Sequence, residues 1–207
     1  WAKTRSFAPL NLAASTMQAW TSLSTMMMSS LPSSAVIVPS AAAIESLHHG
    51  RADCVLLALP FATGEVEVAP LFTDALHVAF PKDDPRDPPE SITPELIDES
   101  RMLLLVDGHC LKDHALAACN RPEMRAFATM LGTSLHTLVQ MVDNGLGLTI
   151  IPEMAVKAGL LNGTDVQARP LNAEHASREI ALVWRTNSPR REEFELLADA
   201  LRGLHAG

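Results

Sequence analysis

The sequence is poor in aromatic residues and contains no tyrosine, although nearly half of it is hydrophobic. Of its 207 residues, 47% are hydrophobic but only 4% are aromatic. Any core must therefore consist mainly of aliphatic side chains and methionine. The length is sufficient for one domain, or two small ones, with a substantial hydrophobic core.

Basic residues are also scarce, and the formal net charge is −8 at pH 7. Nucleic-acid binding requires a basic face that contacts phosphates, so this chain is not expected to bind DNA by itself. No apolar run approaches the roughly 18 residues of a membrane-spanning helix, so we expect no membrane association. The N-terminal residues resemble no signal peptide, and the missing initiator methionine suggests a fragment.

Cysteine occurs three times, at positions 54, 110 and 119. An odd, small number suits a reducing compartment better than a secreted disulfide framework, so we expect a cytoplasmic location. The glycine-rich loops that bind phosphates are absent. Residues 144–147 read Asn-Gly-Leu-Gly, but they lie between a predicted helix and a predicted strand, the wrong order for a dinucleotide site.

Short apolar runs alternate with helical patterns along the first 60 residues, in a β-α-β-α-β order. The predicted strands there are 7–14, 35–38 and 52–59, and the predicted helices are 16–31 and 41–49, with Ser40 as an N-cap. Further strands are predicted at 71–80, 102–106, 148–152, 166–171 and 179–185, and further helices at 93–98, around 110–119, from 135 to about 144 and at 189–204.

This alternation predicts an α/β fold with two Rossmann-like lobes. The second lobe is inserted into the first, and two crossover strands, 76–80 and 180–183, link them. In such an architecture a cleft separates the lobes at the carboxyl ends of strands, where helix N-termini point. The segment around Cys110 is expected at one of these ends.

Cys110 and Cys119 lie nine residues apart in and beside a predicted helix. On one straight helix, nine residues mean a rise of about 13 Å and a rotation of about 900°, which places the two side chains on opposite faces. A disulfide requires Cα atoms within about 7 Å of each other. The two cysteines can therefore bond only if the segment refolds, which is the outline of a redox switch.

Cys110 has the surroundings of a reactive thiol. If Asp107 is the helix N-cap, Cys110 sits in the first turn, where unpaired N–H groups and the helix dipole favour a thiolate. His109 and Lys112 add positive charge or hydrogen-bond donors that favour the thiolate, whereas the negative charges of Asp107 and Asp113 disfavour it. A thiolate reacts with peroxide to give a sulfenic acid, which a second thiol converts to a disulfide.

Cys119 is the candidate second thiol, and Cys54, inside an apolar strand, is expected to be a core residue. Other interpretations remain open. Both Cys110 and Cys119 can be small buried hydrophobic residues. Cys110 and His114 share a helical face with metal-ligand spacing, but no second Cys/His cluster completes a site, so no metal and no cofactor is expected. The sequence also offers little support for nucleophilic hydrolysis, because it contains neither a Gly-x-Ser-x-Gly elbow nor an assignable acid partner.

Several segments resemble the regulatory domain of the LysR-type transcriptional regulators: 132–138, 142–152, 50–54 and 70–72. The run 107–113, with the nine-residue cysteine spacing, specifically resembles the OxyR group of hydrogen-peroxide sensors. The resemblance covers about residues 7–204. It implies a two-lobed, type II periplasmic-binding-protein-like fold, with lobe I at 7–77 and 182–207, lobe II at 78–181, and the end of a linker helix at 1–6.

The same resemblance implies roles for individual residues. Cys110 matches the peroxidatic cysteine and Cys119 the resolving one. Five further residues match positions that bind peroxide: Thr16, Ser40, His109, Lys112 and Asp113. The chain would form homodimers or tetramers and would reach promoter DNA only through a DNA-binding domain that this chain lacks. It would act as a single-turnover sensor and not as an enzyme.

Two departures from the family pattern are visible. Lys112 stands where family members usually carry arginine, which keeps the charge but loses the planar fork. The stretch 16–50 lacks the usual prolines and is a few residues short. Two rival functions are a LysR-type domain that binds a small organic effector between its lobes, with inert cysteines, and a thiol-dependent peroxidase.

Overall fold

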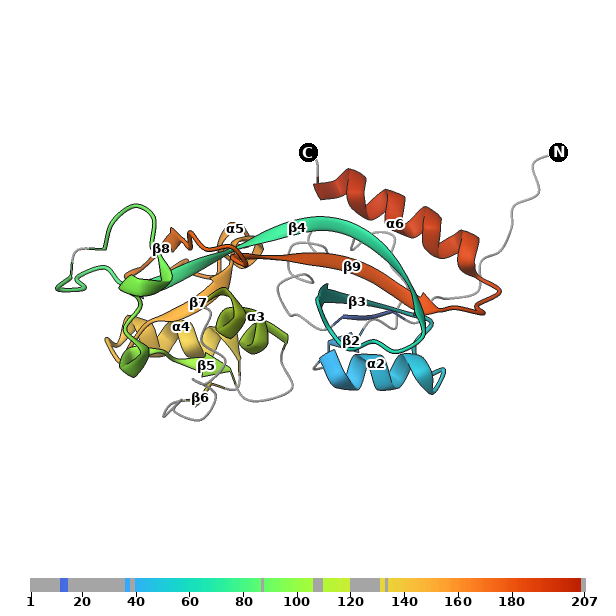
Figure 1. Ribbon diagram of the computed structural model, residues 1–207, viewed down its shortest axis with the longest axis horizontal. Coiled ribbons are helices and arrows are strands. Elements are labelled where there is room, and N and C mark those ends of the chain that lie inside the picture. Colours follow the sequence, from blue (N-terminus) through green and yellow to red (C-terminus); the bar gives the residue numbers. More distant parts are fainter. Residues whose placement is uncertain are drawn as a thin grey trace.

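The protein consists of two lobes that lie side by side and share two long strands, β4 (Val66–Pro81) and β9 (Ser177–Arg185) (Figure 1). The predicted two-lobe α/β architecture is confirmed. Within the described ranges, no helix has the length and apolar character that a membrane crossing requires. The computed structural model describes residues 12–14, 36–37, 40–86, 88–105, 110–119, 131–132 and 134–205.

Lobe I is a sheet with one helix packed on each face (Figure 1). Its strands run in the order β2-β1-β3-β9-β4. The first three are parallel to one another, and β9 is antiparallel to both β3 and β4. The other elements of this lobe are β1 (Leu12–Ala14), β2 (Val36–Ile37), α2 (Ser40–His48), β3 (Cys54–Leu59) and α6 (Arg191–His205).

Strict alternation of side chains decides which helix each residue of β3 and β9 contacts. Cys54 lies opposite Trp184, and both belong to the cluster that packs against Phe194 of α6. The next pair, Val55 and Val183, belongs to the cluster that packs against α2. Because both faces are covered, β3 is apolar at every position, as the sequence pattern predicts, and β9 is apolar from Ile180 to Trp184.

Lobe II is built on the second half of β4, which pairs with β7 (Thr149–Pro152) on one side and β8 (Val166–Pro170) on the other. An isolated parallel bridge joins Met102 to Leu148 and precedes a two-stranded sheet. One large hydrophobic cluster fills this lobe. Its remaining elements are β5 (Leu104–Leu105), α3 (Cys110–Ala118), β6 (Leu131–Gly132), α4 (Leu135–Asp143) and α5 (Glu153–Lys157).

Helix α4 begins and ends where the sequence predicts. The Ser134 hydroxyl accepts a hydrogen bond from the Thr137 N–H at 3.2 Å, which is an N-cap. Gly145 follows the helix with φ of 74°, a conformation that suits glycine. Gly147 serves a different purpose, because a Cβ atom there would lie 2.2 Å from the carbonyl oxygen of Arg101. Because glycine has no Cβ atom, the segment before β7 can lie close against the segment before β5.

Three local predictions are wrong. Ser40 is the first residue of α2, and its hydroxyl bonds to no N–H of the described residues, so it is not the N-cap. The predicted helix 93–98 is instead a pair of 3-10 turns, Pro94–Leu96 and Glu99–Arg101. Helix α5 was not anticipated, since its five residues are too few to show a period. The predicted helix 16–31 lies outside the described residues.

A buried ion pair joins the two long strands where the lobes meet. Asp74 of β4 lies opposite Arg178 of β9, with a carboxylate-to-guanidinium distance of 2.9 Å and side-chain exposures of 2% and 0%. The other Asp74 oxygen accepts the Met154 N–H of α5 at 2.9 Å. One residue later β4 ends its pairing with β9, and Leu76 begins the pairing with β7. The pair therefore fixes β9 and α5 to β4 at the switch between lobes.

Replacing Asp74 by alanine leaves the Arg178 charge buried without its partner. We expect Asp74→Ala to lower the free energy of unfolding by about 3–5 kcal/mol, measured by urea denaturation. The control is Glu195→Ala, which breaks an exposed pair with Arg191 and should cost less than about 1 kcal/mol. Equal losses in the two variants would show that the buried pair does not anchor the junction.

Candidate functional site

The predicted reactive cysteine lies at the start of a short helix. Cys110 is the first residue of α3, which runs for nine residues. The first turn of a helix has unpaired N–H groups and the positive end of the dipole, both of which stabilise an anion such as a thiolate. The backbone thus has the arrangement that the sequence predicts for Cys110. The Cys110 side chain, His109 and Thr16 lie outside the described residues.

Cys119 lies immediately after α3, at its other end. Its N–H donates to the carbonyl oxygen of Ala115 at 3.2 Å, so the helical turn reaches it. Its side chain is 3% exposed within the lobe II core, and it forms no disulfide. Nine residues of helix separate its Cα from that of Cys110 by about 13 Å, well beyond the roughly 7 Å limit for a disulfide.

The predicted peroxide-binding residues of α3 differ in exposure. Lys112 is buried at 6% exposed, whereas Asp113 is exposed to solvent. Ser40 belongs to α2 of lobe I, and no described hydrogen bond or ion pair links its side chain to α3. It is nevertheless fully buried at the N-terminal end of its helix, and its hydroxyl has no partner among the described residues.

His114 connects α3 to the other lobe. Its Nε2 atom lies 3.2 Å from the carbonyl oxygen of Pro60, the residue that follows β3, and donates there in the tautomer with a proton on Nε2. The side chain is 5% exposed, and its Nδ1 has no partner among the described residues. Residues four apart share a helical face, so His114 lies on the same side of α3 as Cys110. The sequence suggested His114 only as a metal ligand.

Cys54 is chemically different from a reactive thiol. It is completely buried beneath α6, and burial, followed by the negative charge of Asp53, raises its pKa to about 12. The core role predicted for it is confirmed. In the described part of the chain, no group of three or more His, Cys, Asp and Glu side chains could hold a metal ion.

Comparison with known families places the chain. The profile described as the LysR substrate binding domain matches residues 34–206, most of the sequence. The chain belongs to this family. Among curated relatives, this LysR domain is 36% identical over 166 residues to the HTH-type transcriptional regulator EstR of Acinetobacter baylyi, covering 79% of the chain and 54% of that protein. It is 33% identical over 164 residues to OxyR of Escherichia coli, covering 79% and 53%.

Solved structures agree with the sequence relatives. The reduced regulatory domain of OxyR2 from Vibrio vulnificus superposes with a TM-score of 0.84 at 30% identity, covering 95% of each chain. The reduced OxyR regulatory domain from Pseudomonas aeruginosa gives 0.77 at 30% identity, covering 94% of this LysR domain and 96% of that chain. The fold and the OxyR resemblance predicted from sequence are therefore confirmed. The LysR domain spans about half the length of the curated relatives it matches.

Two contacts of the site region escaped sequence reasoning. The His114–Pro60 contact joins residues 54 positions apart, and the Asp74–Arg178 pair joins residues 104 apart. No local pattern predicts either. The available signal was a charged residue beside each predicted crossover strand, Asp74 before 76–80 and Arg178 before 180–183, since charged residues in apolar strands are rarely buried unless they are paired.

Because a thiolate and not a thiol reacts with alkylating reagents, Cys54 should be inert in the folded LysR domain. At pH 8 a thiol with a pKa of about 12 is almost fully protonated. We expect iodoacetamide to leave Cys54 unmodified in the native protein and to modify it readily in urea, as measured by peptide mass spectrometry. Equal modification rates in the two conditions would contradict the assigned burial and pKa.

Proposed function

We propose that this chain is the hydrogen-peroxide-sensing regulatory domain of a LysR-type transcription regulator. The observation that carries the proposal is the placement of two cysteines at opposite ends of one short helix that bridges towards the other lobe. Relatives named as OxyR or as hydrogen peroxide-inducible genes activators support it. So does the structural likeness to reduced OxyR regulatory domains.

The chemistry would proceed in two balanced steps. The Cys110 thiolate attacks one oxygen of hydrogen peroxide, the O–O bond breaks, and the leaving hydroxide takes a proton to become water. Cys110 is then a sulfenic acid. The Cys119 thiolate attacks that sulfur, a disulfide forms, and a second water leaves. Two thiols are oxidised by one peroxide, so the reaction stops after one turnover unless a reductant restores the thiols.

Peroxide would be held next to Cys110 by the residues matched to the family pocket. Lys112, buried on α3, would supply positive charge that stabilises both the thiolate and the leaving hydroxide. Thr16, Ser40, His109 and Asp113 would supply hydrogen bonds. Of these, Ser40 has the buried hydroxyl without a described partner, and Asp113 is open to solvent.

Disulfide formation would require α3 to unwind. An isolated nine-residue helix has little stability of its own, because helices shorter than about 12–15 residues are marginal in water. The contacts that hold α3 include packing of its apolar face in lobe II and the His114–Pro60 contact with lobe I. Unwinding would draw Cys119 out of the core and break that contact. Refolding of this segment would be the two-state element that reports oxidation.

The remaining parts of the proposal concern the whole regulator. Residues 1–6 would end a linker helix that leads to a DNA-binding domain. Lobe I would comprise 7–77 and 182–207, and lobe II 78–181. The refolded α3 segment would alter contacts within a cytoplasmic homodimer or tetramer and so reposition the DNA-binding domains on promoter DNA.

One equivalent of hydrogen peroxide added to the reduced protein should remove two hydrogens from its mass. Peptide mapping should locate the change to a Cys110–Cys119 disulfide, because only these thiols combine a reactive position with a resolving partner. Cys110→Ser should abolish the reaction. Cys119→Ser should leave a sulfenic acid at Cys110 that dimedone traps.

The matched control is Cys54→Ala, which should form the same disulfide as the unmodified protein. In the full-length regulator, Cys110→Ser should also abolish peroxide-dependent transcription. A Cys110 that stays unreacted, or that over-oxidises slowly without a bridge, would overturn peroxide sensing.

A second function is favoured by two observations. EstR, a different regulator, is among the relatives. The buried Ser40 hydroxyl at the start of α2 has no partner among the described residues, and helix N-termini attract anionic groups. A LysR domain that binds a small organic anion between its lobes would use this residue. In that case a ligand would raise the melting temperature while peroxide would leave Cys110 and Cys119 reduced.

His114 should favour the reduced state if α3 unwinds on oxidation. A net hydrogen bond is worth about 1 kcal/mol, so His114→Leu should shift the thiol–disulfide equilibrium with glutathione about fivefold towards the Cys110–Cys119 disulfide. His136→Leu, at an exposed position of α4, should leave the equilibrium constant unchanged. The same constant in both variants would mean that the contact with Pro60 survives oxidation or contributes nothing.

A further inference from the structure

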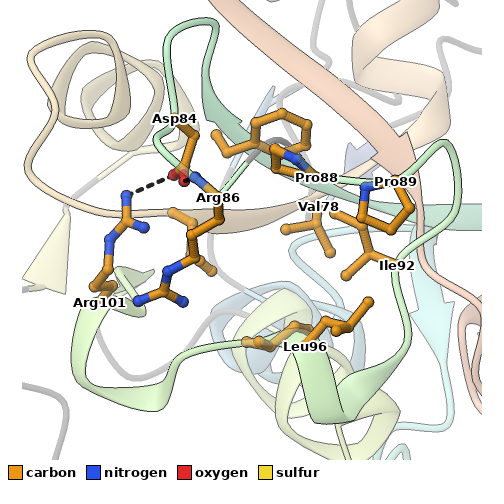
Figure 2. A pocket seen from close by; sticks show the side chains of 11 residues that line it. Val78, Asp84, Arg86, Pro88, Pro89, Ile92, Leu96 and Arg101 are labelled. Atoms are coloured by element: carbon orange, nitrogen blue, oxygen red, sulfur yellow. Dashed lines mark hydrogen bonds and ion pairs between the residues drawn. The ribbon is translucent and has the colours of Figure 1, made fainter.

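A cavity of about 100 Å³ opens at the surface of lobe II, and the described peroxide-site residues Ser40, Lys112 and Asp113 do not line it. Its floor is the end of β4, where Val78 and Phe80 are almost fully buried. Its sides come from Ile92 and Ile97, which flank the 3-10 turn Pro94–Leu96. Leu96 lies at the mouth, 54% exposed, and is one of the few large apolar side chains in the described residues that water reaches so freely. Figure 2 shows Val78, Ile92 and Leu96 among the side chains that line this cavity.

Charged side chains lie on the opposite side of the cavity, where Figure 2 shows Asp84 with Arg86 and Arg101. Arg101 donates to the buried Asp84 carboxylate at 2.7 Å. Arg86 pairs with Asp98, and its backbone N–H donates to Asp84 at 3.1 Å. Among the described residues at this edge, two guanidinium groups thus face two carboxylates, and these four charges balance.

This charge balance bears on what the cavity can bind. An anion would have to displace Asp84 from Arg101, and separating a buried pair leaves an uncompensated charge. A cation would have to displace an arginine from its carboxylate, which separates the same pairs. A neutral oxygen needs no such displacement, because a guanidinium carries five N–H donors, more than one carboxylate oxygen can accept.

The size of the cavity limits the occupant to a single ring. A closed apolar cavity of about 150 Å³ holds benzene. Here the volume is about 100 Å³, and the mouth is open, so a ring can enter with its substituent at the edge. The faces of Phe80, Pro88 and Pro89 line the space and offer flat contact surfaces. These are the features of a small-ligand site, apolar walls with a few convergent polar groups.

We propose that this cavity binds an uncharged, single-ring aromatic molecule with one polar substituent. The ring lies on Val78 and Phe80 and covers Leu96, and the substituent accepts a hydrogen bond from Arg101 or Arg86. Such binding is separate from peroxide sensing and would persist in a protein whose Cys110 and Cys119 are both replaced by serine.

The test uses benzyl alcohol as the probe and methyl NMR of the whole chain as the readout. Saturable shift changes are expected at Val78, Ile92, Leu96 and Ile97, and not at methyl groups of lobe I. Benzoate, of similar size but anionic, should bind at least about fivefold more weakly, because it must compete with a buried ion pair.

A pair of matched variants tests the location. Leu96→Asp at the mouth should weaken benzyl alcohol binding by about fivefold or more, since it replaces an apolar contact by a charge. Leu196→Asp, at a 67% exposed leucine of α6, should change nothing. Shifts that never saturate, shifts that spread through lobe I, or benzoate that binds as tightly as benzyl alcohol would each overturn the proposal, whichever variants fold.

Discussion

The structure depends on one buried ion pair, between Asp74 and Arg178. It lies where β4 stops pairing with β9 and begins to pair with β7, so both lobes take their register from it. A slip of one residue along either strand would turn these charges to the opposite face and reverse every apolar side chain that follows. By also accepting the Met154 N–H, Asp74 fixes the start of α5 against the same point. The junction is therefore set by electrostatics within an otherwise apolar interior, where a displaced partner has no water to replace it.

Against this fixed junction, α3 is the part of the site that can change. It is nine residues long, carries a cysteine at each end, and touches lobe I through a single described side-chain hydrogen bond. Its stability comes from tertiary packing and not from its own length. A chemical event that alters a few contacts can therefore compete with its folding, whereas the sheet that supports it is held by pairing over many residues. In the proposed switch, this contrast between a rigid frame and a marginal helix would let a thiol reaction become a conformational signal.

Sequence reasoning succeeded where the deciding forces are local. The apolar run of β3 marks a strand buried on both faces, and the Ser134 cap with Gly145 marks the two ends of α4. The placement of Cys110 and Cys119 at opposite ends of α3 was predictable because it depends only on spacing along one helix. What escaped prediction depends on the folded chain: the His114 contact with Pro60, the charges that meet across the junction, and the surroundings of Ser40. Helix α5 escaped for another reason, because it is stabilised at its first turn by a side chain from β4.

Gly147 shows how function and folding can be confused in a chain of this kind. It lines none of the sites described above, yet the carbonyl oxygen of Arg101 occupies the place where any side chain would begin. Beside it, the Leu148 N–H donates to that same Arg101 oxygen, and the Leu103 N–H donates to the Leu148 carbonyl oxygen. Every other amino acid would force β7 away from the strand that leads to α3. A genetic screen for regulators that no longer respond would therefore recover substitutions at this glycine alongside those at the cysteines. Only a measurement of folding would separate a regulatory domain that has lost its response from one whose sheet has been pushed apart.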